Sequence, residues 1–246
     1  GKHHRTTSTL TATGRAMSAF PVDPRLARMI IEGSRRDCAK EMMVLAAALT
    51  IQDPRERPAE VRGTADEMHA RFTDDKSDFS SFLLLWQYVN ERQAELSSSQ
   101  LRKMCHREFI NFLRIREWQD LFAQLREMGR TANIRVSNGR DIDASGREVE
   151  IHKSLLSGLL SHVGAKEERE KTYGKAPRGP REYLGARGTK FAIFPGSGLF
   201  KQNPDWVLSA ELVETSRLWA RTNAAIEPQW VEEVGGHLLK KQYSEP

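Results

Sequence analysis

The sequence predicts an α+β protein, in which an all-α helical bundle is followed by a small antiparallel β-barrel or sandwich. Three features of the 246 residues lead to this prediction. Apolar residues recur at helical spacing up to about residue 130. Residues 131–150 are polar and contain two glycines, as in a linker or mobile loop. Short strand-like runs then alternate with turn-forming pairs such as Pro195-Gly196 and Asn203-Pro204.

The helical bundle is predicted to form around one strongly apolar segment. Residues 38–51 are apolar on almost every side, which is typical of a central helix, and Asp53, Pro54 and Pro58 end it. A short amphipathic helix is expected within residues 9–20. Further helices are expected at 65–72, 79–90 and 101–128, with Ser77 or Asp78 capping the second and a serine of 97–99 capping the third. The last one, straight or bent, would bury Cys105, Leu113 and Trp118.

The C-terminal part changes in character. A helix is predicted at 151–160, strands at 191–194, 206–213 and 218–226, and a final helix at 228–239. Between them, residues 166–188 are rich in Gly, Pro, Lys and Arg and are predicted to form a loop.

Composition narrows the classes of function. The net charge of +5 favours phosphate-bearing partners, although many soluble proteins without such partners carry a similar excess. Cys38 and Cys105 form no C-x-x-C pair, so we expect two core thiols and no zinc site or disulfide framework. The sequence has no stretch of about 20 apolar residues, so we expect no membrane partner. The opening Gly1 and polar run predict a piece of a longer cytoplasmic protein.

No motif predicts a reaction centre. Gly174-Lys175 is followed by Ala176, so it is no phosphate-binding P-loop. Asp66-Glu67-Met68-His69 spells a helicase Mg²⁺ motif, but no P-loop precedes it and we interpret it as a coincidence. The histidines are scattered without ligand-pair spacing. Glycines around Ser197 indicate a tight turn and not a nucleophile elbow.

Several long segments resemble the C-terminal part of DEAH-box ATP-dependent RNA helicases of the bacterial HrpA type. Residues 10–29, around Phe20-Pro21-Val22-Asp23-Pro24, resemble the end of their winged-helix domain. Residues 38–58, ending in Ile51-Gln52-Asp53-Pro54-Arg55-Glu56-Arg57-Pro58, and residues 108–118 resemble their helical ratchet domain. Residues 151–160, 191–197, 206–221 and 226–230 resemble their OB-fold domain.

The resemblance implies a division of the chain and a role for it. It implies a remnant of the winged-helix domain at 1–33, a ratchet domain at 34–130, a polar linker at 131–150 and an OB-fold domain at 151–246. The family's two RecA-like domains, which bind ATP and Mg²⁺, have no counterpart here. We therefore expect no cofactor in this chain and no ATPase activity from it alone. Expected partners are single-stranded RNA or DNA, the RecA-like domains and a protein activator.

Candidate RNA-binding residues lie in both predicted parts. In or beside the predicted strands they are Lys190, Lys201, Thr215, Ser216, Arg217 and Arg221, whose cations and hydroxyls can contact phosphate. In the helical part they are Arg55, Arg57, Arg114 and Arg116. Two alternatives stay open. Arg217 and Arg221 could instead pair with Glu211 or Glu214, and Arg114 and Arg116 could be solvated helix charges. Trp219 is the one tryptophan that suits either core packing or base stacking.

Two functions from different classes are compatible with these residues. The first is an RNA-binding accessory region of a helicase that lines its single-strand channel. The second is a protein-interaction platform, in which the basic loop within residues 166–187 docks an acidic activator or a ribosome-associated partner. A free-standing enzyme is disfavoured, since no nucleophile, metal set or phosphate loop is evident.

Overall fold

A computed structural model describes residues 11–18, 20–134, 136, 140–143, 146–168 and 179–236. The helices are α1 (Ala12–Ser18), α2 (Pro24–Arg35), α3 (Ala39–Thr50), α4 (Arg62–His69), α5 (Asp78–Glu95), α6 (Ser98–Arg107), α7 (Phe112–Thr131), α8 (Glu148–Leu159) and α9 (Pro228–Gly235). Short 3-10 turns lie at Ala59–Val61, Ala70–Phe72, Leu160–His162 and Ala186–Gly188. The strands are β1 (Val163–Lys166), β2 (Glu182–Gly185), β3 (Lys190–Ile193), β4 (Trp206–Glu214) and β5 (Leu218–Ala225).

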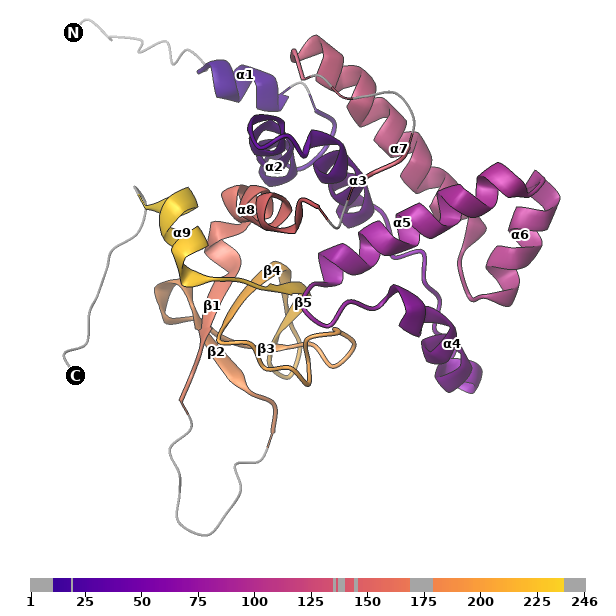
Figure 1. Cartoon of the computed structure of the whole chain (residues 1–246). Helices are drawn as coiled ribbons and strands as arrows, with labels where there is room; N and C mark the ends of the chain where they lie inside the picture. The colour runs from indigo at the N-terminus through magenta and orange to yellow at the C-terminus, as the bar shows by residue number, and fades with distance from the viewer. Residues whose placement is uncertain are drawn as a thin grey trace, which may run out of the picture.

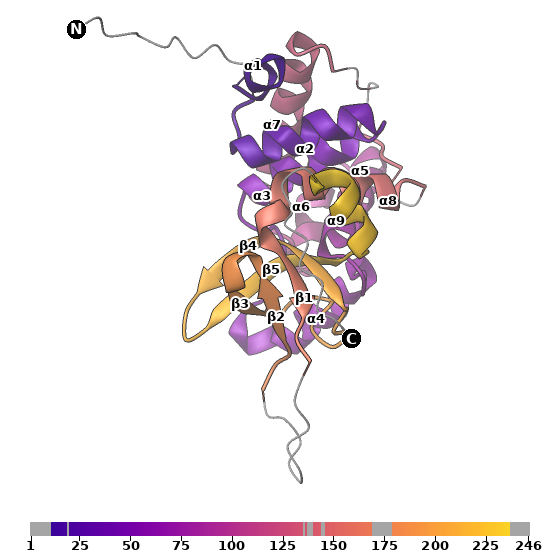
Figure 2. The same ribbon diagram turned by 90° about the vertical axis from the view of Figure 1, so that its left-hand side faces the viewer.

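A helical bundle is followed along the chain by a closed barrel, as the sequence predicts, and the two lie side by side (Figure 1). Figure 1 shows α1 to α7 above and to the right of the barrel, with α8 and α9 over its upper end. In the perpendicular view the barrel again lies below α2 and α3 (Figure 2). None of the helices in these described ranges is long and apolar enough to cross a membrane.

Helix α3 is the centre of the bundle. Residues 42–47 are fully buried on every side of the helix, and α2, α5, α7 and α8 pack around it. Trp118 of α7 donates a hydrogen bond from its indole N–H to the carbonyl of Val44, 2.8 Å away. The predicted central helix is therefore confirmed. Cys38 and Cys105 are buried free thiols, as predicted.

The structure divides the helical stretch predicted at 101–128, straight or bent, into two helices, α6 and α7. Phe109 has a φ of +54° at the break, and the side chain of Asn111 caps the new helix by accepting from Arg114 N. The break is held from outside: Asn111 N donates to the carbonyl of Pro54 and Glu56 N to that of Phe109. The break also places Leu113 outward, 73% exposed, where the sequence predicted a buried residue.

The strands close into a barrel in the order β1-β2-β3-β5-β4. The predicted strands correspond to β3, β4 and β5. Strand β2 lies in the predicted loop at 166–188, and β1 lies mostly between that loop and the helix predicted at 151–160, where no element was predicted. Glycines in both strands are explained by the packing inside the barrel. Gly164 and Gly185 face each other across β1 and β2, and a Cβ on Gly164 would lie 2.4 Å from the ring of Phe191. These glycines therefore let an aromatic ring fill the barrel. The pair β3–β5 is parallel; the other strand pairs of the barrel are antiparallel.

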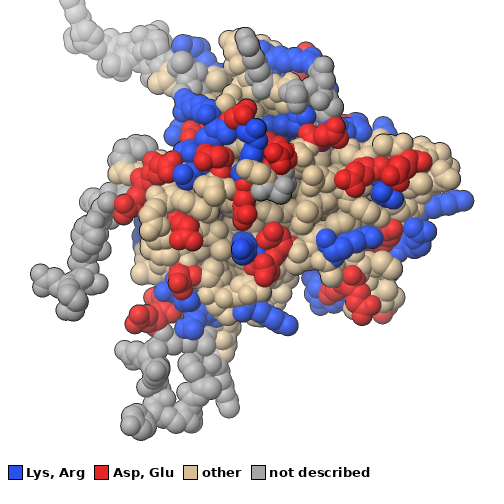
Figure 3. Space-filling model, viewed as in Figure 1, with Lys and Arg blue, Asp and Glu red and all other residues tan. Residues whose placement is uncertain are grey.

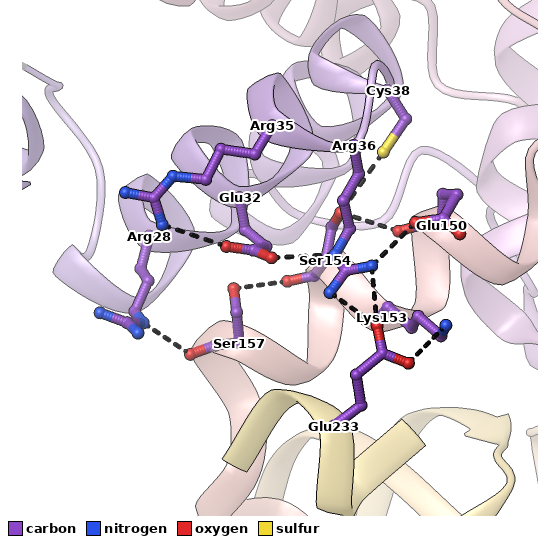
Figure 4. A network of polar contacts seen from close by, with 10 residues as sticks. All are labelled: Arg28, Glu32, Arg35, Arg36, Cys38, Glu150, Lys153, Ser154, Ser157 and Glu233. Carbon is purple, nitrogen blue, oxygen red and sulfur yellow. Dashed lines mark hydrogen bonds and ion pairs between the residues drawn. The ribbon is translucent and has the colours of Figure 1, made fainter. Parts of the chain in front are cut away.

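A polar network joins α2 to α8 and α9. Figure 4 shows Arg36 at its centre, contacting Glu32, Glu150 and Glu233 at 2.9, 2.9 and 3.3 Å. Lys153 adds a second ion pair to Glu233 at 2.7 Å. One arginine thus connects three helices, which keeps the C-terminal helix against the bundle.

His152 of α8 is a buried neutral side chain at the junction of bundle and barrel. Its Nδ1 lies 2.7 Å from the carbonyl of Glu148, and its Nε2 lies 2.7 Å from the hydroxyl of Ser77. One neutral tautomer satisfies both contacts, with Nδ1 donating and Nε2 accepting. Burial lowers the pKa of His152 below its ordinary value.

We expect the protein to lose stability below pH of about 6.5. In that range the histidine becomes protonated in the unfolded chain, whereas burial keeps His152 neutral in the folded protein. The unfolded state then binds more protons, so the free energy of unfolding falls by up to about 1.4 kcal/mol per pH unit. Urea denaturation at several pH values should show this slope, and His152→Gln should reduce it. The exposed His106→Gln should keep it, and equal slopes in both variants would contradict the assignment.

Candidate nucleic-acid interface

A cleft of about 440 Å³ opens where the helical bundle meets the barrel. One wall is the loop between α3 and α4, which carries Arg55 and Arg57, together with Asp66 of α4. The other wall is the turn after β3, residues 194–198, and Arg221 of β5. Three of the ten predicted site residues therefore meet at this cleft, although Arg221 is far from Arg55 and Arg57 in the sequence.

The break between α6 and α7 holds the arginine loop in place. Arg55 forms an isolated β-bridge with Ile110, and the neighbouring backbone bonds from Glu56 and Asn111 close the same contact. His69 of α4 also reaches this break, with Nε2 at 3.0 Å from the carbonyl of Glu108. The loop is thus attached to the bundle at several points, which fixes where its arginines point.

Both arginines of this loop are paired with carboxylates. Arg55 contacts Asp53 through Nε and Nη2, and its guanidinium lies 4.8 Å from the Phe82 ring centre. Arg57 contacts Asp66 in the same two-point manner, at 2.5 and 2.7 Å. This hydrogen bond raises the pKa of Arg57 and lowers that of Asp66. In both pairs Nη1 is outside the two-point contact and keeps its N–H groups for another acceptor.

Arg221 differs from these two because no carboxylate neutralises it in the described part of the chain. It faces Glu211 in the register of β4 and β5, yet the two side chains form no ion pair. Instead its guanidinium lies 4.7 Å from the ring centre of Phe194. The structure therefore contradicts the alternative in which Glu211 or Glu214 neutralises Arg221.

Asp78, the first residue of α5, ties the two walls together. Its carboxylate accepts hydrogen bonds from the hydroxyl of Ser197 (2.6 Å), Gly198 N (2.9 Å) and Asn223 N (2.8 Å). Burial raises the pKa of Asp78, against the effect of these hydrogen bonds. The sequence offered Asp78 as a possible helix cap, a role that Ser77 takes by accepting from Ser80 N. Its role between the two parts is non-local and left no signal in the sequence.

The other predicted residues lie away from the cleft walls. Thr215, Ser216 and Arg217 are exposed at the tip of the β4–β5 hairpin, and Arg217 contacts the ring of Trp219. Lys190 forms an ion pair with Glu167 at 2.9 Å. Lys201 is exposed beside a second hollow on the barrel that Arg181 and Phe200 also line.

Arg114 and Arg116 point in different directions from α7. Arg114 donates to the carbonyl of Asp53 at 3.0 Å, so it supports the arginine loop from behind. Arg116 is exposed and lines a separate shallow hollow with Leu113. Neither side chain lines the cleft between bundle and barrel.

Charge on the visible face is mixed. Figure 3 shows Lys and Arg interspersed with Asp and Glu across the bundle and barrel, without one wide field of a single sign. The cleft is also mixed in charge, because Asp53, Asp66 and Asp78 line it beside its three arginines. Recognition of an anion here would depend on the placement of individual donors more than on overall attraction.

Sequence comparison identifies both halves of this arrangement. Residues 23–110 match the family described as helicase associated domain (HA2), ratchet-like, and residues 151–238 match the oligonucleotide/oligosaccharide-binding (OB)-fold family. The chain is 50% identical to the ATP-dependent RNA helicase HrpA of Escherichia coli over 96% of its length. It is 49% identical, over the same share, to the HrpA homolog of Haemophilus influenzae.

The chain belongs to the HrpA-type DEAH-box helicases. It corresponds to their ratchet-like and OB-fold domains, so the predicted fold class is confirmed at the level of family as well as architecture. A more distant relative is the pre-mRNA-splicing factor ATP-dependent RNA helicase prp22 of Schizosaccharomyces pombe, 28% identical over 94% of the chain. The chain spans 17% of the length of the two HrpA-type relatives and 18% of prp22.

Within this HrpA-type domain pair, an aromatic side chain that was not among the predicted site residues also lies at the cleft. Phe194, inside the segment 191–197 that resembles the OB-fold domain, lies beneath Arg221 and lines the cleft. The available signal was its position directly before the Pro195-Gly196 turn, where a strand ends and its side chain leaves the barrel.

Proposed function

We propose that this domain pair binds single-stranded RNA for an ATP-dependent RNA helicase, with the phosphate backbone held in the cleft between bundle and barrel. One observation carries the proposal: Arg55 and Arg57 from the ratchet-like half and Arg221 from the OB-fold half converge on one open cleft. A groove that combines cations from two rigid elements suits a sequence-tolerant contact to a nucleic-acid backbone. ATP and Mg²⁺ would act in other parts of such a helicase.

The individual donors suit phosphate despite their acidic neighbours. The Arg57–Asp66 pair is part-exposed, at 35% and 45% of the two side chains, so it contributes at most about 1 kcal/mol and yields readily to a competing anion. Its Nη1 lies 3.3 Å from where a Cβ on residue 196 would be, so Gly196 keeps the space in front of it open. Arg221 adds a cation that pairs with no carboxylate among the residues that the structure describes.

Because the acids in the cleft offset the arginines, we expect modest affinity. A dissociation constant of about 1–100 µM at physiological salt is in the range of non-specific nucleic-acid binding. Two or three phosphate contacts predict a log–log salt slope of about −1.4 to −2.1 for a single strand.

Replacing Arg221 by alanine is expected to weaken RNA binding and to reduce the magnitude of this slope by about 0.7, the loss of one phosphate contact. Arg57→Ala should weaken RNA binding by more than the loss of one phosphate contact would, because the negative charge of Asp66 is then left without its cation at the cleft. Anisotropy titrations of a fluorescein-labelled oligouridylate at four salt concentrations measure both effects.

The matched control is Arg35→Ala, which removes an equally charged side chain from α2, away from the cleft. It should leave affinity and slope unchanged apart from a small general charge effect. If the wild-type chain gives no signal with RNA at low salt, the proposal fails and the protein-interaction alternative gains support. If Arg221→Ala and Arg35→Ala behave alike, the cleft is not where phosphate binds.

A further inference from the structure

Four side chains form a continuous row on the outside of the barrel: Arg217, Trp219, Phe194 and Arg221. The guanidinium of Arg217 lies 5.5 Å from the ring centre of Trp219. Trp219 meets Phe194 edge to face, with ring centres 6.1 Å apart and planes at 89°. Arg221 completes the row at 4.7 Å from Phe194. We call these four residues the aromatic row.

Strand geometry explains why the row faces outward. Trp219 and Arg221 alternate within β5, and Arg217 continues the same alternation directly before the strand, so the three side chains lie on one face. The residue between the last two, Ala220, is fully buried in the barrel core, which puts the opposite face inside. Phe194 joins the row because β3 runs parallel to β5, with Ile193 paired to Ala220.

Packing does not account for the two aromatic rings. Trp86 and Trp118 are fully buried in the main apolar cluster, and Trp206 and Trp230 pack against it. Trp219 and Phe194 are half-buried and belong neither to that cluster nor to the barrel's own apolar cluster. Their described ring contacts are with each other and with two exposed arginines. Large rings in such a position are typical of a binding surface.

We infer that the aromatic row is a stacking platform for unpaired nucleobases, and this inference rests on the proposed RNA-binding function. Phe194 and Arg221 line the cleft as well as the row, so a strand whose phosphates lie in the cleft can pass directly onto the rings. A base stacks more strongly on an aromatic ring than an exposed guanidinium does. An arriving base therefore displaces Arg217 or Arg221 from the ring face, and the freed cation reaches the adjacent phosphate.

The test compares two strands with equal phosphate numbers on the full chain. One is an oligouridylate of about 12 nucleotides, within the site size of an OB-fold, and the other is an abasic oligomer of the same length. We expect the abasic strand to bind at least about fivefold more weakly, the effect of one stacked base. We also expect oligouridylate, but not the abasic strand, to quench tryptophan fluorescence.

Two variants assign the effect to the rings. Trp219→Leu and Phe194→Leu keep apolar bulk but remove the flat π surface. Each variant should bind oligouridylate about fivefold more weakly than the wild-type chain does, whereas its affinity for the abasic strand should change by less than about twofold. Trp219→Leu should also abolish the quenching, because the other four tryptophans lie outside the row. Leu184→Ala, a loss of exposed apolar surface on β2, is the control and should change neither affinity.

The outcomes separate the two proposals. Equal affinity for both strands, with no quenching and no loss in either leucine variant, overturns the stacking platform and leaves phosphate binding in the cleft intact. Failure of the wild-type chain to bind either strand overturns the RNA-binding function and the platform together. If circular dichroism shows that one leucine variant is unfolded, the other variant and the wild-type affinities for the two strands still test the stacking platform.

Discussion

Replacing Trp118 by alanine is expected to lower the free energy of unfolding by about 3–5 kcal/mol. Trp118 is 1% exposed and contacts Trp86 and Phe82 edge to face, at ring distances of 5.0 and 6.0 Å. Alanine would leave a cavity among these rings and would remove the hydrogen bond to Val44. A domain typically has about 5–15 kcal/mol of stability in total, so this loss comes close to unfolding it.

Urea denaturation followed by circular dichroism measures the effect, and two variants on the same helix calibrate it. Trp118→Phe keeps a ring in the cluster but loses the indole N–H, and should cost about 1–2 kcal/mol. Leu113→Ala removes a side chain that is 73% exposed and should stay within about 0.5 kcal/mol. If Leu113→Ala lowered the free energy of unfolding more than Trp118→Ala does, α7 would have to present the opposite face to the bundle.

Replacing Asp78 by alanine is expected to cost about 2–4 kcal/mol and to loosen the barrel from the bundle. The change leaves Gly198 N–H and Asn223 N–H without their acceptor at the junction. The loss is partly offset, because a carboxylate that is costly to bury is also removed. Asp75→Ala, at an exposed position in the loop just before α5, should have little effect on stability.

RNA binding gives a second readout of Asp78 that separates charge from geometry. Removing an acid from the cleft would strengthen RNA binding if charge alone mattered. We expect weaker binding instead, because the turn at residues 194–198 and β5 would no longer be held at a fixed distance from Arg57. Anisotropy titration of labelled oligouridylate against Asp78→Ala and Asp75→Ala distinguishes the two, and tighter binding by Asp78→Ala would contradict the geometric role.

The candidate site was partly foreseeable. Arg55, Arg57 and Arg221 could be proposed from charge and family resemblance, because they lie beside well-defined elements. Their convergence could not, because it depends on the break at Phe109, where a residue with positive φ is held by hydrogen bonds to residues 54–56. Neither glycine nor proline marks that break, so helical periodicity continued through it.

The sequence by itself determined the parts of this protein whose physical causes are local. Apolar spacing specified the central helix α3 and the strands β3 to β5, and Ser77 and Ser97 marked helix starts through side chains that accept from the first turn. The tertiary structure decided what depends on distant residues. Gly164 and Gly185 lie in strands where the ring of Phe191 from β3 occupies the space that a side chain would fill. Asp78 connects the two domains because its carboxylate accepts hydrogen bonds from three donors of the barrel. Local patterns carry no information about such partners, which only the folded chain brings together.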